Sequence, residues 1–255
     1  MTLLIYNGSF EGLLTAVFET YERKLTDVKI LKALVYQPEL HSESLVVISD
    51  PEKAKRIWEG LKKRISIAKC NEVYKTFLSE LPIIEDTILS FIRHVFSTHE
   101  NIEKDYGHKS VLAITKLAKQ VHHEKHRMEA FVRFQRTKDD LYYASIEPDY
   151  NVLPLIASHF KERYADQHWL IYDKRRSYGI QYDKNSFGVY EVELALATDV
   201  THEFLPGSIC HEDEPRYQNL WKDYFQSVNI GVRKNTKLHL RHVPVRYWKY
   251  LVEKR

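Results

Sequence analysis

Two kinds of hydrophobic pattern alternate along the first part of the chain. A short apolar run at 3–6 predicts a buried strand, and apolar residues at helical spacing follow from Phe10. The segment 7–9 between them reads as a turn that ends in a serine helix cap. A second apolar run, 44–49, leads directly into Asp50-Pro51, a pair typical of a helix start. The pattern therefore predicts two strand-to-helix units near the N-terminus.

The next stretch is helical in pattern. Residues 71–97 predict two helices, broken near Leu81-Pro82. We therefore expect a largely helical N-terminal half. It would form an α/β lobe over residues 1–80, followed by a second domain over 81–255. No linker composition marks this boundary.

Residues 109–129 predict a long amphipathic helix that leads into the second domain. At about 100° per residue, His122, His126 and Glu129 share one flank of its apolar face. A basic stripe lies on the outer side of the same helix. It consists of Lys116, Lys119, His123 and Arg127. An ordinary solvated helix face explains the stripe equally well when it is considered alone.

Short apolar or alternating runs dominate residues 130–194. They predict strands at 130–136, 141–146, 169–172, 178–182 and 189–194. A helix at 150–165 interrupts them, and an amphipathic helix over 217–225 and a short helix after Pro244 complete the chain. Strands grouped together with helices to one side predict the α+β class. We expect one mainly antiparallel sheet, flanked by the helices at 109–129 and 150–165.

Charge is distributed unevenly, although the net charge of the 255-residue chain is only +3. Residues 231–255 hold eight Lys and Arg against one acid, whereas residues 189–215 hold seven acids and no Lys or Arg. A basic tail of this kind suits phosphates. The alternative, left open by the sequence, is that the acidic stretch 191–214 covers the tail.

The cysteine count and the hydropathy suggest a compartment. Cys70 and Cys210 form neither a disulfide framework nor a zinc or iron–sulfur spacing, so we expect both thiols to be structurally inert. The N-terminus has no basic region typical of a signal peptide, and no run approaches the roughly 20 apolar residues of a membrane span. We expect a cytoplasmic protein without membrane contact.

Candidate catalytic groups cluster around the junction after the long helix. The histidines there miss the His-Glu-x-x-His spacing of zinc proteases, so we expect no metal and no cofactor. His126, Arg133 and Glu147 remain the candidate catalytic residues, in a pocket that would also contain Arg127 and Trp169. The alternative is structural: His126 is a hydrogen-bonded structural histidine, and Glu147 pairs with Arg127 or Arg133.

Candidate nucleic-acid contacts are basic residues, with one aromatic, in the helix stripe, in the turn at 173–176 and in the tail. They are Lys116, Lys119, Arg127, Lys174, Arg175, Arg176, Arg233, Lys237, Arg241, Arg246, Trp248 and Lys249. Basic groups interleaved with aromatic rings are typical of surfaces that bind phosphates and stack unpaired bases. We therefore expect a preference for single-stranded or damaged DNA.

Six segments also carry a resemblance to a known family. They are YNGSFEGLL, HEKHRMEAFVRF, IEPDYNVLPLIASHF, HWLIYDKRRSYGIQYD, RYQNLWKDYFQSVNI and PVRYWKYL. The sequence resembles bacterial proteins described as DNA metabolism or DNA repair proteins that contain a domain of unknown function. The chain departs from the pattern at Asn7, where aspartate is expected, and at Val245, where a basic residue is expected. The second departure removes one phosphate contact from the tail.

The resemblance implies a setting and leaves the reaction open. Members look like companions of a radical-SAM protein similar to DNA photoproduct lyases, and the domain occurs fused to uracil-DNA-glycosylase-like domains. Our leading hypothesis is a DNA-repair accessory protein that binds DNA and works with the radical-SAM enzyme. A uracil-DNA-glycosylase-like protein would be a further partner. The alternatives are an enzyme acting on a damaged base or nucleotide, and a protein-binding adaptor without DNA contact.

Overall fold

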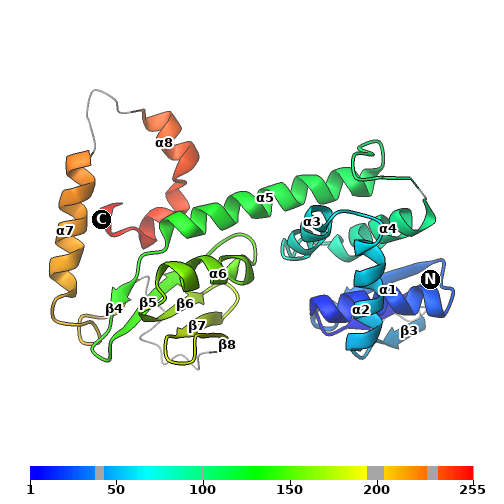
Figure 1. Ribbon diagram of the computed structural model, residues 1–255, viewed down its shortest axis with the longest axis horizontal. Helices are drawn as coiled ribbons and strands as arrows, with labels where there is room; N and C mark the ends of the chain where they lie inside the picture. Colours follow the sequence, from blue (N-terminus) through cyan, green and yellow to red (C-terminus); the bar gives the residue numbers. More distant parts are fainter. Residues whose placement is uncertain (38–42, 99, 194–203, 229–234, 255) are drawn as a thin grey trace. The chain divides into compact units, whose positions relative to one another are not determined.

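The computed structural model describes residues 1–37, 43–98, 100–193, 204–228 and 235–254 (Figure 1). The chain forms two compact units, residues 1–122 and 123–255. The domain boundary expected near residue 80 falls inside the first unit, where the helices on either side of it pack against each other. None of the helices in the described part of the chain is long and apolar enough to cross a membrane.

The first unit combines a small parallel sheet with helices. Its elements are β1 (Thr2–Tyr6), α1 (Phe10–Glu22), β2 (Val28–Lys32), the 3-10 helix η1 (Ala33–Val35), β3 (Glu43–Val46), α2 (Pro51–Lys62), α3 (Ile67–Phe77), α4 (Ile84–Ser97) and the start of α5 (Lys109–Phe131). The strands run parallel in the order β2–β1–β3. Residues 3–6 of the central strand are buried, as expected for a strand with neighbours on both sides.

Local capping groups fix where the first helices begin. The Ser9 hydroxyl accepts a hydrogen bond from the Gly12 amide at 2.9 Å, and the Asp50 carboxylate accepts from the amides of Glu52 and Lys53. Pro51 occupies the first helical turn of α2. These caps satisfy amides that lack partners within the helix. The helix starts predicted from the sequence are confirmed.

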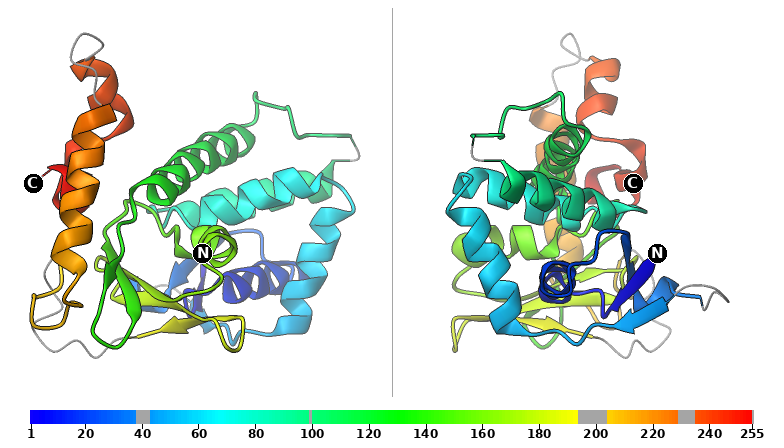
Figure 2. Two further views of the ribbon diagram at one scale, coloured as in Figure 1. Left: turned by 60° about the vertical axis from the view of Figure 1, so that its left-hand side comes forward. Right: turned by 90° about the vertical axis from the view of Figure 1, so that its right-hand side faces the viewer.

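The second unit is built on a five-stranded sheet in the order β4–β5–β6–β7–β8. Its elements are the end of α5, β4 (Gln135–Arg136), β5 (Leu141–Ile146), α6 (Leu153–Arg163), β6 (His168–Asp173), β7 (Tyr178–Asp183), β8 (Gly188–Val192), α7 (Glu214–Val228), α8 (Thr236–His242) and the 3-10 helices η4 (Val245–Tyr250) and η5 (Val252–Lys254). Helix α7 packs against η5, and the C-terminal end of the chain lies beside α7 in Figure 1 and in the left-hand view of Figure 2.

The fold is mixed α/β, and the expectation of a mainly antiparallel sheet is not confirmed. β5 and β6 run parallel, with Leu141 opposite His168 and Ile146 opposite Asp173, so the five-stranded sheet is mixed. The sheet of the first unit is entirely parallel. The parallel direction of β5 and β6 follows from the helix α6 that connects them. A helix between two strands returns the chain to the end where the first strand began, so the second strand runs in the same direction.

The predicted strand at 130–136 is wrong over most of its length. Ala130 and Phe131 belong to the last turn of α5, the Val132 amide donates to the Met128 carbonyl, and only Gln135–Arg136 pair as a strand. Once a long helix is established, each further residue adds a hydrogen bond at little cost. This continuation outweighs the short alternating pattern.

Aromatic side chains form the centre of the second unit. Trp169 is fully buried and stacks on Tyr182, with ring centroids 5.5 Å apart. Phe134 and Phe160 pack on the same indole ring. This cluster joins β6 and β7 to α6 and to the segment after α5. It therefore places Trp169 in the hydrophobic core.

Candidate functional site

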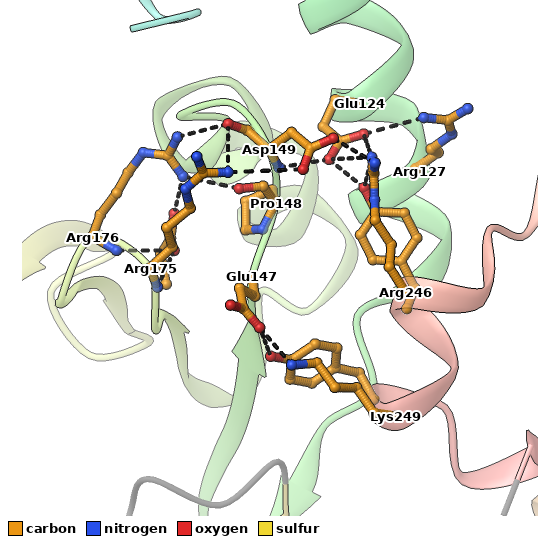
Figure 3. A network of polar contacts seen from close by, with 12 residues as sticks. Glu124, Arg127, Glu147, Pro148, Asp149, Arg175, Arg176, Arg246 and Lys249 are labelled. Carbon is orange, nitrogen blue, oxygen red and sulfur yellow. Dashed lines mark hydrogen bonds and ion pairs between the residues drawn. The ribbon is translucent and has the colours of Figure 1, made fainter.

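The loop after β5, Glu147-Pro148-Asp149, is the centre of a polar network in the second unit (Figure 3). Because β5 and β6 are parallel, the loop after β5 and the turn after β6 meet at the same edge of the sheet. The Arg176 guanidinium donates to the carbonyls of Pro148 and Asp149, each at 3.1 Å. The parallel pairing thus brings together two segments that the sequence separates by a helix.

A buried carboxylate anchors this loop from the other side. Glu124 on α5 is only 1% exposed, and it accepts a hydrogen bond from the Asp149 amide at 2.9 Å. It also pairs with Arg246 at 3.1 Å and Arg127 at 3.3 Å, and it accepts a hydrogen bond from the Tyr247 hydroxyl. A buried carboxylate requires such a set of donors. Glu124 therefore joins α5, the loop and the C-terminal segment.

Arg246 connects Glu124 to the surface. Its guanidinium lies 2.5 Å from the Asp149 carboxylate and stacks over the Tyr247 ring at 4.7 Å. Burial and the hydrogen bond to Glu124 raise the pKa of the Tyr247 phenol, so it stays protonated as a donor. Arg246 is consequently held by three neighbours while part of its side chain faces solvent.

Glu147 is engaged by the C-terminal segment. Its carboxylate accepts hydrogen bonds from Lys249 Nζ at 2.6 Å and from the Tyr250 hydroxyl at 2.8 Å. The bond from Lys249 lowers the pKa of Glu147, and burial offsets this only partly. A general acid or base works best with a pKa near the operating pH. A carboxylate whose pKa lies below its ordinary value fits a positioning or pairing role better.

The turn after β6 is organised by Asp173. This fully buried carboxylate accepts from the amides of Arg175 and Arg176, and from the Arg176 guanidinium at 2.8 Å. Burial raises the pKa of Asp173, and the Arg176 pair opposes that effect. Arg176 is therefore a structural partner. Arg175 is more exposed, and its guanidinium lies 3.3 Å from the Asp149 carbonyl and 3.8 Å from the Asp149 carboxylate.

The network carries an excess of positive charge. It contains five basic side chains, Arg127, Arg175, Arg176, Arg246 and Lys249, and four carboxylates, Glu124, Glu147, Asp149 and Asp173. Lys174 in the same turn adds a sixth basic side chain, and its charge contributes to the lowered pKa of Glu147. The formal charge of this group is therefore +2, and two of its four carboxylates are buried. The side chains of Arg175, Arg246 and Lys249 are between 43% and 56% exposed. We call this group the basic loop surface.

The three candidate catalytic residues have separate partners. His126 pairs with Glu129 at 3.0 Å, Arg133 pairs with Glu253 at 2.8 Å, and Glu147 pairs with Lys249. Trp169, expected in the same pocket, lies in the core. The enzyme hypothesis requires the three side chains to share one site, whereas each is engaged with a different partner. The catalytic assignment stays a prediction.

The remaining candidate nucleic-acid contacts lie elsewhere. Lys116 and Lys119 are exposed on the part of α5 that belongs to the first unit, and Lys237 and Arg241 are exposed on α8. Arg233 lies outside the described residues.

Two further points about the tail concern Trp248 and the acidic stretch 191–214. The Trp248 indole donates to the Val243 carbonyl at 3.0 Å, and Lys254 Nζ lies 5.2 Å from the ring centroid. The alternative left open by the sequence was that the acidic stretch 191–214 covers the tail, and residues 194–203 of that stretch lie outside the described part. Glu214 binds the Arg136 amide and Gln218.

Glu124 and Tyr247 hold the basic loop surface together, and neither was among the candidate site residues. One signal was available. Glu124 lies three residues after Val121 and four before Met128, both buried, so the carboxylate falls on the apolar face of the helix. A carboxylate at such a position predicts a paired, buried charge. Two of its partners, Arg246 and Tyr247, lie more than 100 residues later and carried no local signal.

Sequence reasoning also did not predict a pocket in this part of the second unit. A cavity of about 470 Å³ in the second unit is lined by aromatic rings, with Arg133 and Arg136 at its walls. Tyr217 and Trp221 contribute from α7, one turn apart, on a helix whose apolar face stays largely exposed. Aromatic residues at this spacing on an exposed helix face were the available signal. We call this feature the aromatic pocket.

The described residues contain no group of three or more His, Cys, Asp or Glu side chains arranged to hold a metal ion. Cys70 and Cys210 are both buried, and burial raises the pKa of each thiol. A raised pKa disfavours the thiolate, which is the reactive form of cysteine.

Comparison with known proteins defines the family. No curated protein matches the sequence. Residues 82–253 match the family described as a domain of unknown function, DUF4130, which covers most of the chain and nearly all of the second unit. The match begins two residues after the boundary expected from the sequence. It also agrees with the domain of unknown function implied by the resemblance. The chain belongs to the DUF4130 family.

Proposed function

We propose that this protein binds nucleic acid through the basic loop surface and acts as a DNA-repair accessory protein. The observation that carries the proposal is the convergence of cationic groups from α5, the β6–β7 turn and the C-terminal segment around one loop (Figure 3). These groups come from positions up to 122 residues apart. Phosphates are the ligand class that such a cluster recognises.

Preorganisation supports the same proposal. Arg246 is fixed by Glu124 and Asp149, and Lys249 is fixed by Glu147, yet the side chains of both remain partly exposed. An arginine held in one orientation presents its paired N–H groups to a phosphate at a reduced entropy cost. The buried Glu124 carboxylate thus contributes to binding indirectly, because it orients the Arg246 guanidinium at the surface.

The resemblance supports the biological setting of the proposal. It implies a radical-SAM repair enzyme as the companion and a uracil-DNA-glycosylase-like protein as a further partner, and the cysteine usage favours the cytoplasm. His126, Arg133 and Glu147 are engaged with three different partners, so a role in presenting DNA to that companion is better supported than catalysis.

Salt dependence of binding tests the proposal. We would measure the affinity for a labelled single-stranded oligonucleotide between about 50 and 200 mM salt. The test variant replaces Lys174, Arg175 and Lys249 by alanine. Each retained phosphate contact contributes about 0.7 to the slope of log affinity against log salt. Loss of three contacts should therefore flatten the slope by about 2 and weaken binding at low salt.

The control variant removes the same charge from elsewhere in the second unit. It replaces Lys138, Lys161 and Lys184, three exposed lysines without an ion pair to any described residue. This control should leave the slope unchanged. Arg246 is unsuitable as a test position, because its loss would leave the buried Glu124 without one of its partners. The proposal fails if the parent protein does not bind at low salt, or if both triple variants change the slope equally. Either result would favour the alternative of a protein-binding adaptor without DNA contact.

A further inference from the structure

We infer that the aromatic pocket holds one unpaired nucleobase of the strand whose phosphates lie on the basic loop surface. The inference rests on the proposed function, and it names the chemical group that the protein reads. The cavity, about 470 Å³, is of the size found in small-molecule sites. It lies between the segment after α5, the start of β5, the end of α6 and helix α7. Its lining includes Phe134, Tyr142, Tyr164, Gln167, Tyr217 and Trp221.

One buried carboxylate fixes the wall of the pocket. Glu253, whose side chain is 4% exposed, accepts from the Arg133 guanidinium at 2.8 Å and from the Trp221 indole at 2.9 Å. These two partners also stack on each other, with the guanidinium carbon 5.0 Å from the indole ring. A flat surface of guanidinium and indole is therefore present before any ligand arrives. Such surfaces stack nucleobases.

Further aromatic rings of the lining are ordered by packing. Tyr164 meets Phe134 edge to face, with ring centroids 5.4 Å apart, and lies parallel to Phe160. Phe134 in turn contacts the core indole of Trp169. These rings are anchored in the hydrophobic core, whereas Tyr217 lies at the exposed rim. The pocket thus has a rigid inner wall and an open entrance.

Polar groups suited to a base edge also line the cavity. Glu214 is buried and accepts from the Arg136 amide and the Gln218 amide, each at 3.0 Å, which leaves further acceptor positions on its oxygens. The side-chain amide of Gln167 and the Tyr142 hydroxyl, which both line the cavity, make no hydrogen bond to the described residues. A carboxylate and an unpaired amide are groups that can accept from and donate to the edge of a base.

Charge distinguishes the pocket from a phosphate site. Arg133 is paired with Glu253, and Arg136 is paired with Asp140 at 2.6 Å, so both arginines that line the cavity are neutralised. Glu214 adds a negative charge. An anionic phosphate gains little here, whereas a flat neutral ring with N–H donors fits. The phosphates would bind instead at the basic loop surface, which carries the excess positive charge.

The two sites lie at opposite ends of the same elements. Tyr142 stands at the start of β5, and Glu147 follows its end, a separation of about 16 Å along the strand. The C-terminal segment also joins them, because Lys249 binds Glu147 while Glu253 holds the pocket wall. One single strand of a few nucleotides can therefore contact both. This geometry selects unpaired DNA, since a base within a duplex cannot enter the cavity.

Removal of the bases without removal of the phosphates tests the inference. The probes are an oligothymidylate of about 12 nucleotides and an abasic oligomer of equal length, each labelled at one end. Stacking of one base predicts that the parent protein binds the oligothymidylate about 5- to 150-fold more tightly. Tyr217→Ala should lose most of this preference while its affinity for the abasic oligomer stays unchanged. Gln167→Ala, which removes the side-chain amide from the lining of the pocket, should also reduce the preference.

The control is matched in residue type and exposure. Tyr190 on β8 is 52% exposed and Tyr217 is 55% exposed, but only Tyr217 lines the pocket. Tyr190→Ala should therefore retain the preference, and unchanged thermal unfolding of both variants verifies that they fold. Equal affinity of the parent for the two oligomers overturns the inference and leaves the proposed function standing. A preference that survives both Tyr217→Ala and Gln167→Ala also overturns it. If neither oligomer binds, the proposed function fails and the inference falls with it.

Discussion

The carboxylate of Glu124 on α5 accepts a hydrogen bond from the hydroxyl of Tyr247, 123 residues later in the chain. The two residues are almost completely buried, at 1% and 2% exposure. Arg246, next to Tyr247, pairs with the same carboxylate and reaches the Asp149 loop. One buried contact therefore closes the second unit and also positions a cation at the proposed binding surface.

This relationship predicts a large effect on stability at Glu124. Glu124→Ala removes the acceptor of four groups and should lower the free energy of unfolding by about 3 kcal/mol. Glu147→Ala breaks a partly exposed ion pair and should cost at most about 1 kcal/mol. Urea unfolding followed by circular dichroism measures both. Equal costs for the two variants would contradict the structural role of Glu124.

Glu253 predicts a dependence of stability on pH. Burial raises its pKa, but the hydrogen bonds from Arg133, its own backbone amide and Trp221 together lower the pKa below the ordinary value of 4.5. A carboxyl group with a lowered folded-state pKa contributes stability above its unfolded pKa, and that contribution is lost as pH falls through the folded value.

The comparison of the parent protein with Glu253→Gln measures this contribution. The parent should be more stable at neutral pH, and the difference between the two should shrink as pH falls below about 4.5. Urea unfolding at a series of pH values provides the test. A difference that is constant with pH would show that the ionised form of Glu253 contributes nothing, and the pocket wall would need another explanation.

Trp169 should behave as a core residue. Because it is fully buried and packs on Tyr182 and Phe160, Trp169→Ala should destabilise the protein by about 3–5 kcal/mol. The control is Tyr190→Ala, an exposed aromatic on β8, with an expected change within about 0.5 kcal/mol. Calorimetric or urea unfolding compares them. If Trp169→Ala is stable but binds nucleic acid poorly, Trp169 belongs to the binding site and the core assignment is wrong.

The two thiols should react slowly in the folded protein. Burial raises the pKa of Cys70, and burial together with the Glu214 charge raises the pKa of Cys210. The thiolate is the reactive form, so both raised pKa values and low accessibility reduce the rate. Alkylation with iodoacetamide at pH 8, followed by mass spectrometry, should be far slower in buffer than in urea. Modification of either thiol at the denatured rate would refute this prediction.

Local signals determined much of the secondary structure. Ser9 and Asp50-Pro51 set the starts of α1 and α2, because a helix start depends on capping groups within three residues. The long helix at 109–129 and the hairpin of β6 and β7 were also recognisable. Their hydrophobic periods extend over enough residues to distinguish a helix from a strand.

Tertiary contacts decided the sheet. The sequence indicated strands on either side of the helix at 150–165, but a strand carries no local mark of its partner's direction. The crossover through α6 made β5 and β6 parallel, and that pairing brought the Glu147–Asp149 loop to the turn at Asp173–Arg176. At the end of α5, the Phe131 ring packs against Tyr247, a contact that the sequence did not signal.

The sequence alone supplied the chemistry of the site, which is its arginines, lysines and aromatic rings, and the structure decided which of them act together. Arg246 looked like a free cation of a basic tail, and only the burial of Glu124 makes it a fixed partner. Arg133 looked catalytic, and Glu253, 120 residues away, makes it the wall of a pocket. Residue type and short-range spacing are local properties. The burial of a charge is not, because it depends on which distant segment covers that charge.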